Sequence, residues 1–199
     1  MPTIQTLVLG DYQVNCYIVY PEGSSRCCVI DPGYSSEVIL SKLSQLGLQL
    51  DAILLTHGHF DHVGAVRDLV AATDCQVYLN PLECAMPPQL TAGKLYYTDE
   101  LSDGLEFTAA GLPFSVLHTP GHTPGSVCLI TGDTMFSGDT LFAGSCGRTD
   151  LPGGSPQAMA ASLKRLSALE ENMWVLPGHG ESTSLSDEKK YNPYLRRFL

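Results

Sequence analysis

Short apolar runs separated by glycine and proline turns fill the first part of the chain, and this pattern predicts β-strands. We expect strands at Thr3–Leu9, Cys16–Tyr20, Cys27–Ile30, Ala52–Leu55 and Gln76–Leu79. Between the third and fourth strands, apolar residues from Val38 to Leu46 recur at helical spacing. That helix is predicted to end at Gly47, and Ser35 or Ser36 can cap its first turn.

The second half of the chain repeats this order of apolar strands followed by an amphipathic helix. We expect strands at Leu105–Phe107, Phe114–Leu117, Val127–Thr131, Thr134–Phe136 and Trp174–Leu176. A helix with an apolar face is predicted to begin at Ser155. The tail Asp187–Leu199 is predicted to close over the functional site as a helix interrupted at Pro193. Together these elements predict one α/β domain over residues 1–199, with two sheets packed together and helices outside.

The composition limits the partners that the chain can have. Its 199 residues carry a formal net charge of −10 with few basic clusters, which disfavours nucleic acid or an anionic membrane as a partner. We find neither a signal-peptide pattern nor an apolar run long enough to span a membrane. Seven cysteines, an odd number that includes adjacent Cys27 and Cys28, do not form a disulfide framework. We therefore expect reduced thiols and a cytoplasmic protein, with the oligomeric state left open.

The main chemical signal is the segment Thr56–His62, which directly follows the fourth predicted strand and contains His-x-His-x-Asp-His. On a chain still extended at the strand end, His57 and His59 project to the same side. A helix that begins near Asp61 adds a carboxylate and the imidazole of His62 from its first turn. Imidazole suits zinc and iron, and a carboxylate can hold a second cation nearby, so this segment predicts a metal site.

Three further candidate ligands follow apolar runs elsewhere in the chain. His122 and His179 each come directly after a Pro-Gly turn, and Asp139 follows the strand predicted at Thr134–Phe136. Because α/β folds gather their sites at strand ends, we expect these residues to meet the central motif. His118 lies within a predicted strand between apolar neighbours, and we expect it to be a structural histidine.

These residues and their motifs resemble the metallo-β-lactamase superfamily across essentially the full chain. The resemblance rests on four segments, at residues 57–62, 120–126, 137–142 and 177–180. It implies a four-layer αββα sandwich with two metal ions at one edge between the sheets. By the family pattern, one metal is held by His57, His59 and His122, the second is held by Asp61, His62 and His179, and Asp139 bridges the two.

Within that superfamily, residues 138–148 are similar to the glyoxalase II group, which hydrolyses hydroxyacyl thioesters of glutathione. Arg148-Thr149-Asp150 departs from the long glyoxalase II enzymes and looks more like their compact bacterial relatives and the persulfide dioxygenases. Only Glu181–Leu199 follow the last ligand, whereas the long enzymes carry a C-terminal helical domain that helps to bind glutathione. The resemblance therefore implies a compact thioesterase that takes a small thioester.

The implied cofactors are two divalent metal ions, with zinc expected first and iron or manganese as alternatives. They would share a bridging hydroxide that attacks the thioester carbonyl, and Asp61 would orient it and relay a proton. Candidates for substrate binding are Arg148, Cys146 and Tyr191, although Arg148 has an internal pair with Asp150 as an equal alternative.

Other functions stay open at this point. An iron-dependent persulfide dioxygenase would use one iron held by His57, His122 and Asp139, the two-histidine, one-carboxylate arrangement of iron–oxygen chemistry. A lactonase or phosphodiesterase could use the same metals, and a non-catalytic metal-binding domain is the third class. Asp31, at the end of a predicted strand, either fixes a ligand histidine from behind or caps a turn.

Overall fold

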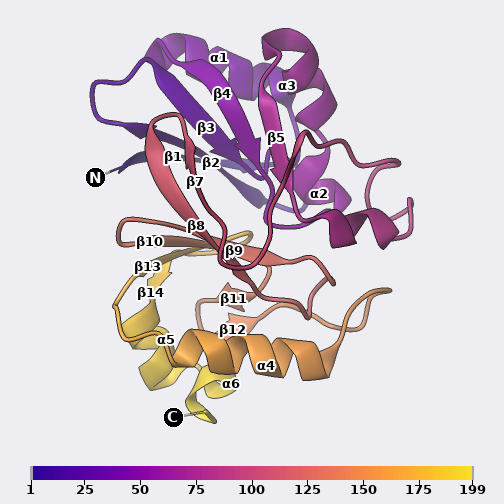
Figure 1. Ribbon diagram of the computed structural model, residues 1–199, viewed down its shortest axis with the longest axis vertical. Helices are drawn as coiled ribbons and strands as arrows, with labels where there is room; N and C mark the ends of the chain where they lie inside the picture. The colour runs from indigo at the N-terminus through magenta and orange to yellow at the C-terminus, as the bar shows by residue number, and fades with distance from the viewer. Residues whose placement is uncertain (1, 199) are drawn as a thin grey trace.

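The computed structural model describes residues 2–198, and two six-stranded mixed sheets form its centre (Figure 1). The first sheet has the order β1-β2-β3-β4-β5-β6, antiparallel from β1 to β3 and parallel from β3 to β6. Its strands are β1 (Pro2–Leu9), β2 (Val14–Pro21), β3 (Arg26–Ile30), β4 (Gln49–Leu54), β5 (Gln76–Leu79) and β6 (Asp99–Glu100).

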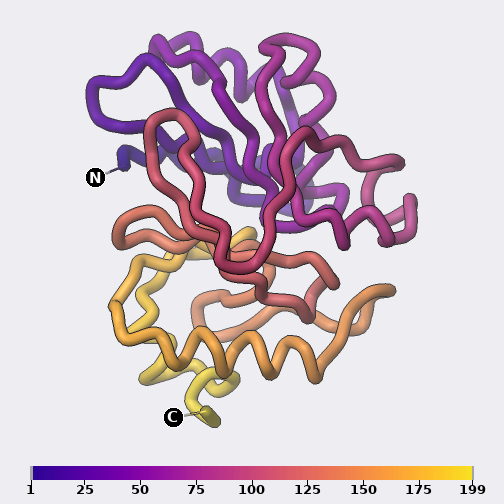
Figure 2. The backbone as a smooth tube through the Cα atoms, viewed as in Figure 1, coloured from indigo at the N-terminus to yellow at the C-terminus, as the bar shows by residue number. Residues whose placement is uncertain are grey.

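The second sheet has the order β14-β13-β10-β9-β8-β7, in which only the β10–β13 pair is parallel. Its strands are β7 (Glu106–Ala109), β8 (Leu112–His118), β9 (Val127–Thr131), β10 (Thr134–Gly138), β13 (Trp174–Pro177) and β14 (Thr183–Ser184). A separate ribbon pairs β11 (Leu141–Phe142) with β12 (Ser145–Cys146). The chain completes the first sheet before it enters the second, as the tube in Figure 2 shows.

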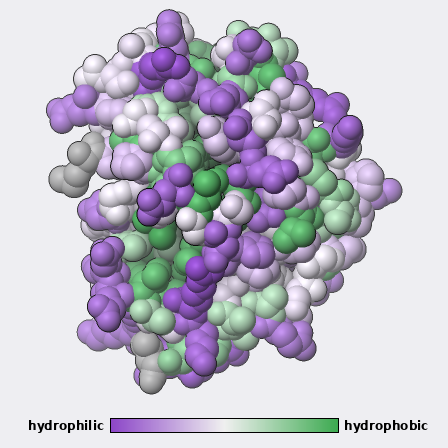
Figure 3. All heavy atoms as spheres, in the orientation of Figure 1, coloured by the Kyte–Doolittle hydropathy of each residue, from purple (hydrophilic) through white to green (hydrophobic). Residues whose placement is uncertain are grey.

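Helices lie on the outer side of each sheet (Figure 1). They are α1 (Ser36–Leu46), α2 (Phe60–Val63), α3 (Val66–Thr73), α4 (Pro156–Ser167), α5 (Leu185–Tyr191) and α6 (Pro193–Arg196). The short 3-10 helix η1 (Pro81–Ala85) follows β5. On the face in Figure 3, hydrophilic residues cover much of the surface and hydrophobic ones show as separate patches between them. Most of the apolar residues are therefore buried between the layers.

Three buried apolar clusters separate the four layers. Ile39 of α1 and Leu69 of α3 pack against the first sheet, and Leu163 of α4 packs against the second. Between the sheets, Phe114 and Phe136 belong to the central cluster. Burial of such side chains contributes about 1.5–3 kcal/mol each, so the sandwich is stabilised through all three clusters. The predicted αββα fold is confirmed.

Strand β2 illustrates why the strands were recognisable as apolar runs. Cys16 and Ile18 face the helices, whereas Tyr17 and Val19 face the second sheet. Both faces of the strand are therefore buried, and the sequence shows a continuous run of apolar residues instead of an alternation with polar ones.

The predicted helix ends are partly confirmed. α1 is followed by Gly47 in the left-handed conformation (φ 67°), which glycine adopts at little cost. Ser155 caps α4, because its side chain accepts a hydrogen bond from the backbone N–H of Ala158 at 3.2 Å. The prediction of a serine cap on α1 is wrong, since Ser35 makes no capping side-chain hydrogen bond and Ser36 is already the first helical residue.

The predicted position of the C-terminal tail is also wrong. The tail forms α5 and α6, which break at Asn192 before Pro193, and Leu199 lies outside the described residues. Leu185 and Leu195 pack into the same cluster as α4, on the outer side of the second sheet (Figure 1). The tail therefore completes the outer layer and does not close over the metal ligands.

Candidate metal centre

Four strand ends deliver the predicted ligands to one edge of the sandwich. The central motif follows β4, and α2 starts at Phe60, so that Asp61 and His62 lie in its first turn as predicted. His122 follows β8, Asp139 directly follows β10, and His179 follows β13. Because β10 and β13 are parallel neighbours, the last two side chains emerge on the same side.

One group of ligands consists of three buried histidines. The ligand atoms of His57, His59 and His122 all lie within 4.8 Å of one another. His59 Nδ1 and His122 Nε2 are 2.8 Å apart, although the two residues come from different sheets. Three imidazoles in this arrangement offer the nitrogen donors that a single divalent ion prefers.

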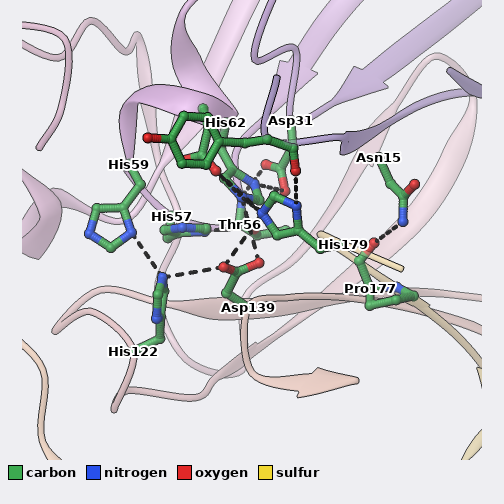
Figure 4. A network of polar contacts seen from close by, with 12 residues as sticks. Asn15, Asp31, Thr56, His57, His59, His62, His122, Asp139, Pro177 and His179 are labelled. Atoms are coloured by element: carbon green, nitrogen blue, oxygen red, sulfur yellow. Dashed lines mark hydrogen bonds and ion pairs between the residues drawn. The ribbon is translucent and has the colours of Figure 1, made fainter. Parts of the chain in front are cut away.

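A second group combines a carboxylate with two histidines. The ligand atoms of Asp61, His62 and His179 also lie within 4.8 Å of one another. His179 Nε2 is 3.3 Å from Asp61 Oδ2 and 3.3 Å from His62 Nε2. This group borders the first and shares its edge of the sandwich (Figure 4).

Asp139 lies between the two groups (Figure 4). Its Oδ2 is 3.4 Å from His122 Nε2 in the first group and 3.8 Å from His179 Nε2 in the second. Its Oδ1 is 3.5 Å from His62 Nε2. One carboxylate therefore faces both groups, which is the position that a bridging ligand requires.

The cluster leaves donor atoms without partners, which tests whether cations fit it. Among the described residues, His57 Nε2, His59 Nε2 and Asp139 Oδ1 are buried and make no hydrogen bond. An unsatisfied buried polar group costs about 1–3 kcal/mol, and coordination to a cation would remove that cost. Nitrogen and carboxylate donors suit zinc, iron and manganese. The donor set therefore fits divalent metal ions.

Asp31 supports the second group from the side away from the cluster. It both fixes a ligand histidine and caps the turn at the end of its strand, the two alternatives predicted from the sequence. Its Oδ2 lies 3.0 Å from His62 Nδ1, on the opposite side of the ring from the cluster. The same carboxylate accepts hydrogen bonds from the backbone N–H and the hydroxyl of Thr56 at 2.8 and 2.6 Å. Asp31 thus ends its strand and also fixes the ring orientation of a ligand histidine.

Backbone carbonyls orient two other histidines, and no sequence pattern indicates these contacts. His122 Nδ1 lies 2.8 Å from the carbonyl oxygen of Arg148, and His179 Nδ1 lies 3.0 Å from that of Tyr12. Asn15 also donates through Nδ2 to the carbonyl oxygens of Pro177 and Gly180, at 3.0 and 2.9 Å, on either side of His179 (Figure 4). Such contacts between distant segments fix which ring nitrogen is free.

Two rings of the first group, His57 and His59, are neutral at neutral pH. Burial, followed by the neighbouring His62, holds the pKa of His57 well below its usual range. Burial and then His122 lower the pKa of His59 to about 4. Both rings therefore keep a free lone pair, which is the form that binds metal.

The second group carries charge. Burial lowers the pKa of His62, but the carboxylates of Asp139 and Asp31 outweigh that effect and raise it to about 9. Burial raises the pKa of Asp61, but a hydrogen bond from His179 and the charge of His62 bring it to about 2. Asp61 is therefore ionised at neutral pH, and a cation bound here must displace a proton from His62.

A cleft of about 540 Å³ opens onto the ligands. Apolar and aromatic side chains form much of its wall, namely those of Tyr12, Phe60, Leu90, Phe142 and Leu151. Its polar lining comes from ligand residues of both groups and from Ser145, Cys146 and Arg148. The cleft is large enough for a small molecule and is more apolar than the cluster at its floor.

The three predicted substrate residues have different positions. Arg148 and Cys146 line the cleft. The guanidinium of Arg148 pairs with Asp150 through two hydrogen bonds of 2.7 Å each, which is the internal pair considered as an alternative. Tyr191 on α5 is 63% exposed and does not line this cleft, so its position does not support a substrate role. His118 makes a hydrogen bond to the carbonyl oxygen of Pro124 at 2.9 Å and stays outside both ligand groups.

Residues 9–179 match the family model of the metallo-β-lactamase superfamily, and the chain belongs to that superfamily. It is similar to hydroxyacylglutathione hydrolase GloC of Haemophilus influenzae, with 31% identity over 207 residues that cover 96% of this chain and 97% of GloC. The predicted class, a metallo-hydrolase of this superfamily, is thereby confirmed. Among residues 2–198, no helix is both long and apolar enough to cross a membrane.

Two solved structures are similar over nearly the whole chain. The B3 metallo-β-lactamase BLEG-1 shares 35% identity at a TM-score of 0.90, covering 97% of this chain and 99% of BLEG-1. TTHA1623 in a di-iron-bound form shares 43% identity at a TM-score of 0.85, covering 96% of this chain and all (100%) of TTHA1623. Both carry the fold described above, and the second shows that a relative at this identity holds iron.

Proposed function

We propose that this protein hydrolyses small acyl thioesters with two divalent ions held by the seven ligands. The observation that carries the proposal is the pair of ligand groups that share Asp139 at the floor of an apolar cleft. The first ion would be held by the three buried histidines and the second by Asp61, His62 and His179, with zinc as the expected metal. GloC, which is named as a hydroxyacylglutathione hydrolase, supports the thioester as substrate class.

When bound, divalent ions at such a site supply a water that ionises near neutral pH and a Lewis acid for a carbonyl oxygen. The ionised carboxylate of Asp61 borders the cleft and can accept a hydrogen bond from the attacking water, which orients it. Asp31 and the carbonyl oxygen of Tyr12 hold His62 and His179 with their free nitrogens toward the cluster.

The chain does not need its own nucleophile for this reaction. Cys146 is the thiol that lines the cleft, but burial raises its pKa, so it stays protonated at neutral pH. Ser145 lies beside it and has neither ring nitrogen nor carboxylate as a hydrogen-bond partner among the described contacts. The water is therefore the better attacking group.

The walls of the cleft favour a relaxed preference for the thiol. Arg148 is a cation on the cleft wall, and its Nε and Nη2 already pair with Asp150, so an anionic thiol such as glutathione would have to compete with that carboxylate. Aromatic and aliphatic residues such as Phe60 and Phe142 instead favour an uncharged acyl or thiol part. GloC is matched over 97% of its length, so a protein named as a hydroxyacylglutathione hydrolase can have a chain as compact as this one.

The second candidate is an iron-dependent persulfide dioxygenase. It is favoured by the iron in TTHA1623 and by the proximity of Asp139 to the three-histidine group. A two-histidine, one-carboxylate set of His57, His122 and Asp139 would suit iron and oxygen. The same groups would also serve the hydrolysis of a lactone or of a β-lactam, the substrate class named for BLEG-1.

A substrate panel tests these candidates. Zinc-, manganese- and iron-loaded protein would be assayed with neutral and anionic thioesters, a lactone, a β-lactam and glutathione persulfide, with oxygen uptake recorded in parallel. We expect thioester cleavage without oxygen uptake, and turnover of neutral thioesters at least as fast as that of glutathione thioesters. Oxygen-dependent turnover of the persulfide without thioester cleavage would replace the hydrolase with the dioxygenase.

A further inference from the structure

Glu83 is a buried carboxylate that the proposed reaction does not use. It lies in η1, is 0% exposed, and forms no ion pair with a lysine or arginine among residues 2–198. Its Oε2 accepts a hydrogen bond from the backbone N–H of Gly58 at 2.6 Å. Its Oε1 accepts one from the backbone N–H of Gly125, also at 2.6 Å. A buried charge of this kind is costly unless its hydrogen bonds compensate, so the two N–H groups hold it in place.

The two bonded glycines belong to the two loops that build the three-histidine group. Gly58 lies between His57 and His59 in the loop after β4 of the first sheet. Gly125 lies three residues after His122 in the loop between β8 and β9 of the second sheet. One side chain therefore ties together, across the interface of the sheets, the segments that carry all three ligands of this group.

The glycines themselves fit this carboxylate closely. A Cβ at residue 58 would lie 3.0 Å from Glu83 Oε2, and a Cβ at residue 125 would lie 2.7 Å from Glu83 Oε1. Both contacts are shorter than ordinary van der Waals packing allows, so any larger residue at position 125 would displace the carboxylate. The loops approach Glu83 closely because neither position carries a side chain.

A backbone hydrogen bond also joins these two segments, close to the end of β4 and at the start of β9. The backbone N–H of Val127 donates to the carbonyl oxygen of Thr56 at 2.9 Å. That contact lies at the strand end, whereas the Glu83 bridge lies beyond it, next to the ligands. Of these two contacts, the Glu83 bridge therefore lies nearer to the ligands.

We propose that Glu83 is a positioning residue that sets the separation of His122 from His57 and His59 and so the metal affinity of the three-histidine group. The inference rests on the proposed metal site and holds whichever substrate is hydrolysed. A carboxylate is needed because both of its oxygens must accept. Glutamine would turn an N–H₂ group toward one of the two backbone N–H groups, and aspartate is one methylene too short to keep both bonds.

Two single-substitution variants, each of which keeps only one ligand group, serve as backgrounds in which the effect of Glu83→Gln on that group is measured. His179→Ala leaves the three-histidine group, and His57→Ala leaves the group of Asp61, His62 and His179. In each background, zinc affinity of full-length protein would be measured by competition with a chromophoric chelator, with and without Glu83→Gln. We expect Glu83→Gln to weaken zinc binding by about 10–100-fold in the His179→Ala background, the usual effect of losing a partner behind the ligands. In the His57→Ala background we expect less than about a threefold change.

Glu188→Gln provides the matched control, because Glu188 is also a buried carboxylate that joins separate segments. It accepts hydrogen bonds from the backbone N–H of Gly144 at 2.8 Å, from Thr183 Oγ1 at 2.7 Å and from Asn192 Nδ2 at 2.7 Å. We expect Glu188→Gln to lower the melting temperature of the metal-free protein and to leave zinc affinity unchanged in both backgrounds.

Several results would overturn the inference. They are unchanged zinc affinity in Glu83→Gln, an equal loss in both backgrounds, or an equal loss in Glu188→Gln. If Glu83→Gln does not fold, Glu83→Asp is measured instead, with the same expected selectivity. Wild-type protein that binds no metal would overturn the metal site together with this inference. Metal binding without thioester hydrolysis would overturn only the proposed substrate.

Discussion

The two ligand groups differ in burial and charge. In the three-histidine group all three side chains are buried, and the low pKa values of His57 and His59 keep those two rings neutral. In the other group, the side chains of His179 and Asp61 are 27% and 12% exposed, and the group carries charged side chains at the edge of the cleft. A buried neutral site suits tight holding of a cation, whereas an accessible charged site suits exchange with substrate and water. Ligand residues of both groups nevertheless line the same cleft.

The residues that support the two groups also differ in what they contact. Glu83 joins backbone segments and acts on the spacing of the first group. Asp31 and the carbonyl oxygen of Tyr12 act on the ring orientation of His62 and His179 in the second. A change behind one group should therefore act mainly on that group, except at Asp139, where the two groups meet, and at Thr56, whose hydroxyl contacts both Asp31 and His57 Nδ1.

The largest effect is expected at Asp139. Because its carboxylate faces both groups, Asp139→Ala should lower the affinity for both ions by more than about 100-fold, which exceeds the usual loss for partners behind ligands. Turnover should fall with metal content, as measured by elemental analysis after dialysis. Asp133→Ala, in an exposed turn, is the control and should keep both ions. Full metal retention in Asp139→Ala would contradict the shared role.

Asp31→Asn should affect the second group selectively. The amide cannot accept from His62 and from both donors of Thr56 at once, so the ring loses its fixed orientation. We expect about 10–100-fold weaker zinc binding in the His57→Ala background. The loss should be smaller in the His179→Ala background, where Asp31 reaches His57 only through the hydroxyl of Thr56. Asp103→Asn, which breaks an exposed pair with Arg165, should change neither. Equal losses in the two backgrounds would remove the distinction between the groups.

The pH dependence of metal uptake should also separate the groups. The pKa of His62 is raised to about 9, so binding at the second group releases a proton and becomes tighter as the pH rises from about 6 to 8, by up to about tenfold per unit. The pKa of His59 is about 4, so it adds no such dependence in the first group above that pH. Zinc titrations of the two single-group backgrounds at both pH values measure the slopes, and equal slopes would contradict this contrast.

The smallest effect is expected at His118, outside both groups. His118→Ala removes the hydrogen bond to the carbonyl oxygen of Pro124, which should cost about 1 kcal/mol in the free energy of unfolding. Metal content and turnover should stay at the wild-type level. Urea unfolding and elemental analysis would measure the two quantities, and a loss of metal would place His118 in the site.

The strands and the seven candidate ligands could be predicted because their signals are local. A strand buried on both faces, such as β2, leaves a continuous apolar run, and a ligand directly after a strand end has a defined direction. The tail was misplaced because its helices pack through Leu185 and Leu195 onto α4, and the pattern of a helix does not identify its partner. Glu83 could not be found, because one glutamate in a short segment gives no sign of the two distant glycines that it contacts.

The contact of Asn15 with the strand end before His179 has a consequence for synthesis of the protein. Asn15 and Pro177 are 162 positions apart, so the first hairpin meets its partner only after those 162 positions have left the ribosome. The segment that carries His57, His59, Asp61 and His62 emerges much earlier and exposes four of the seven donors without the other three. A cation captured at that stage would be bound by an incomplete site. We therefore expect that correct metal loading follows synthesis of the chain through His179.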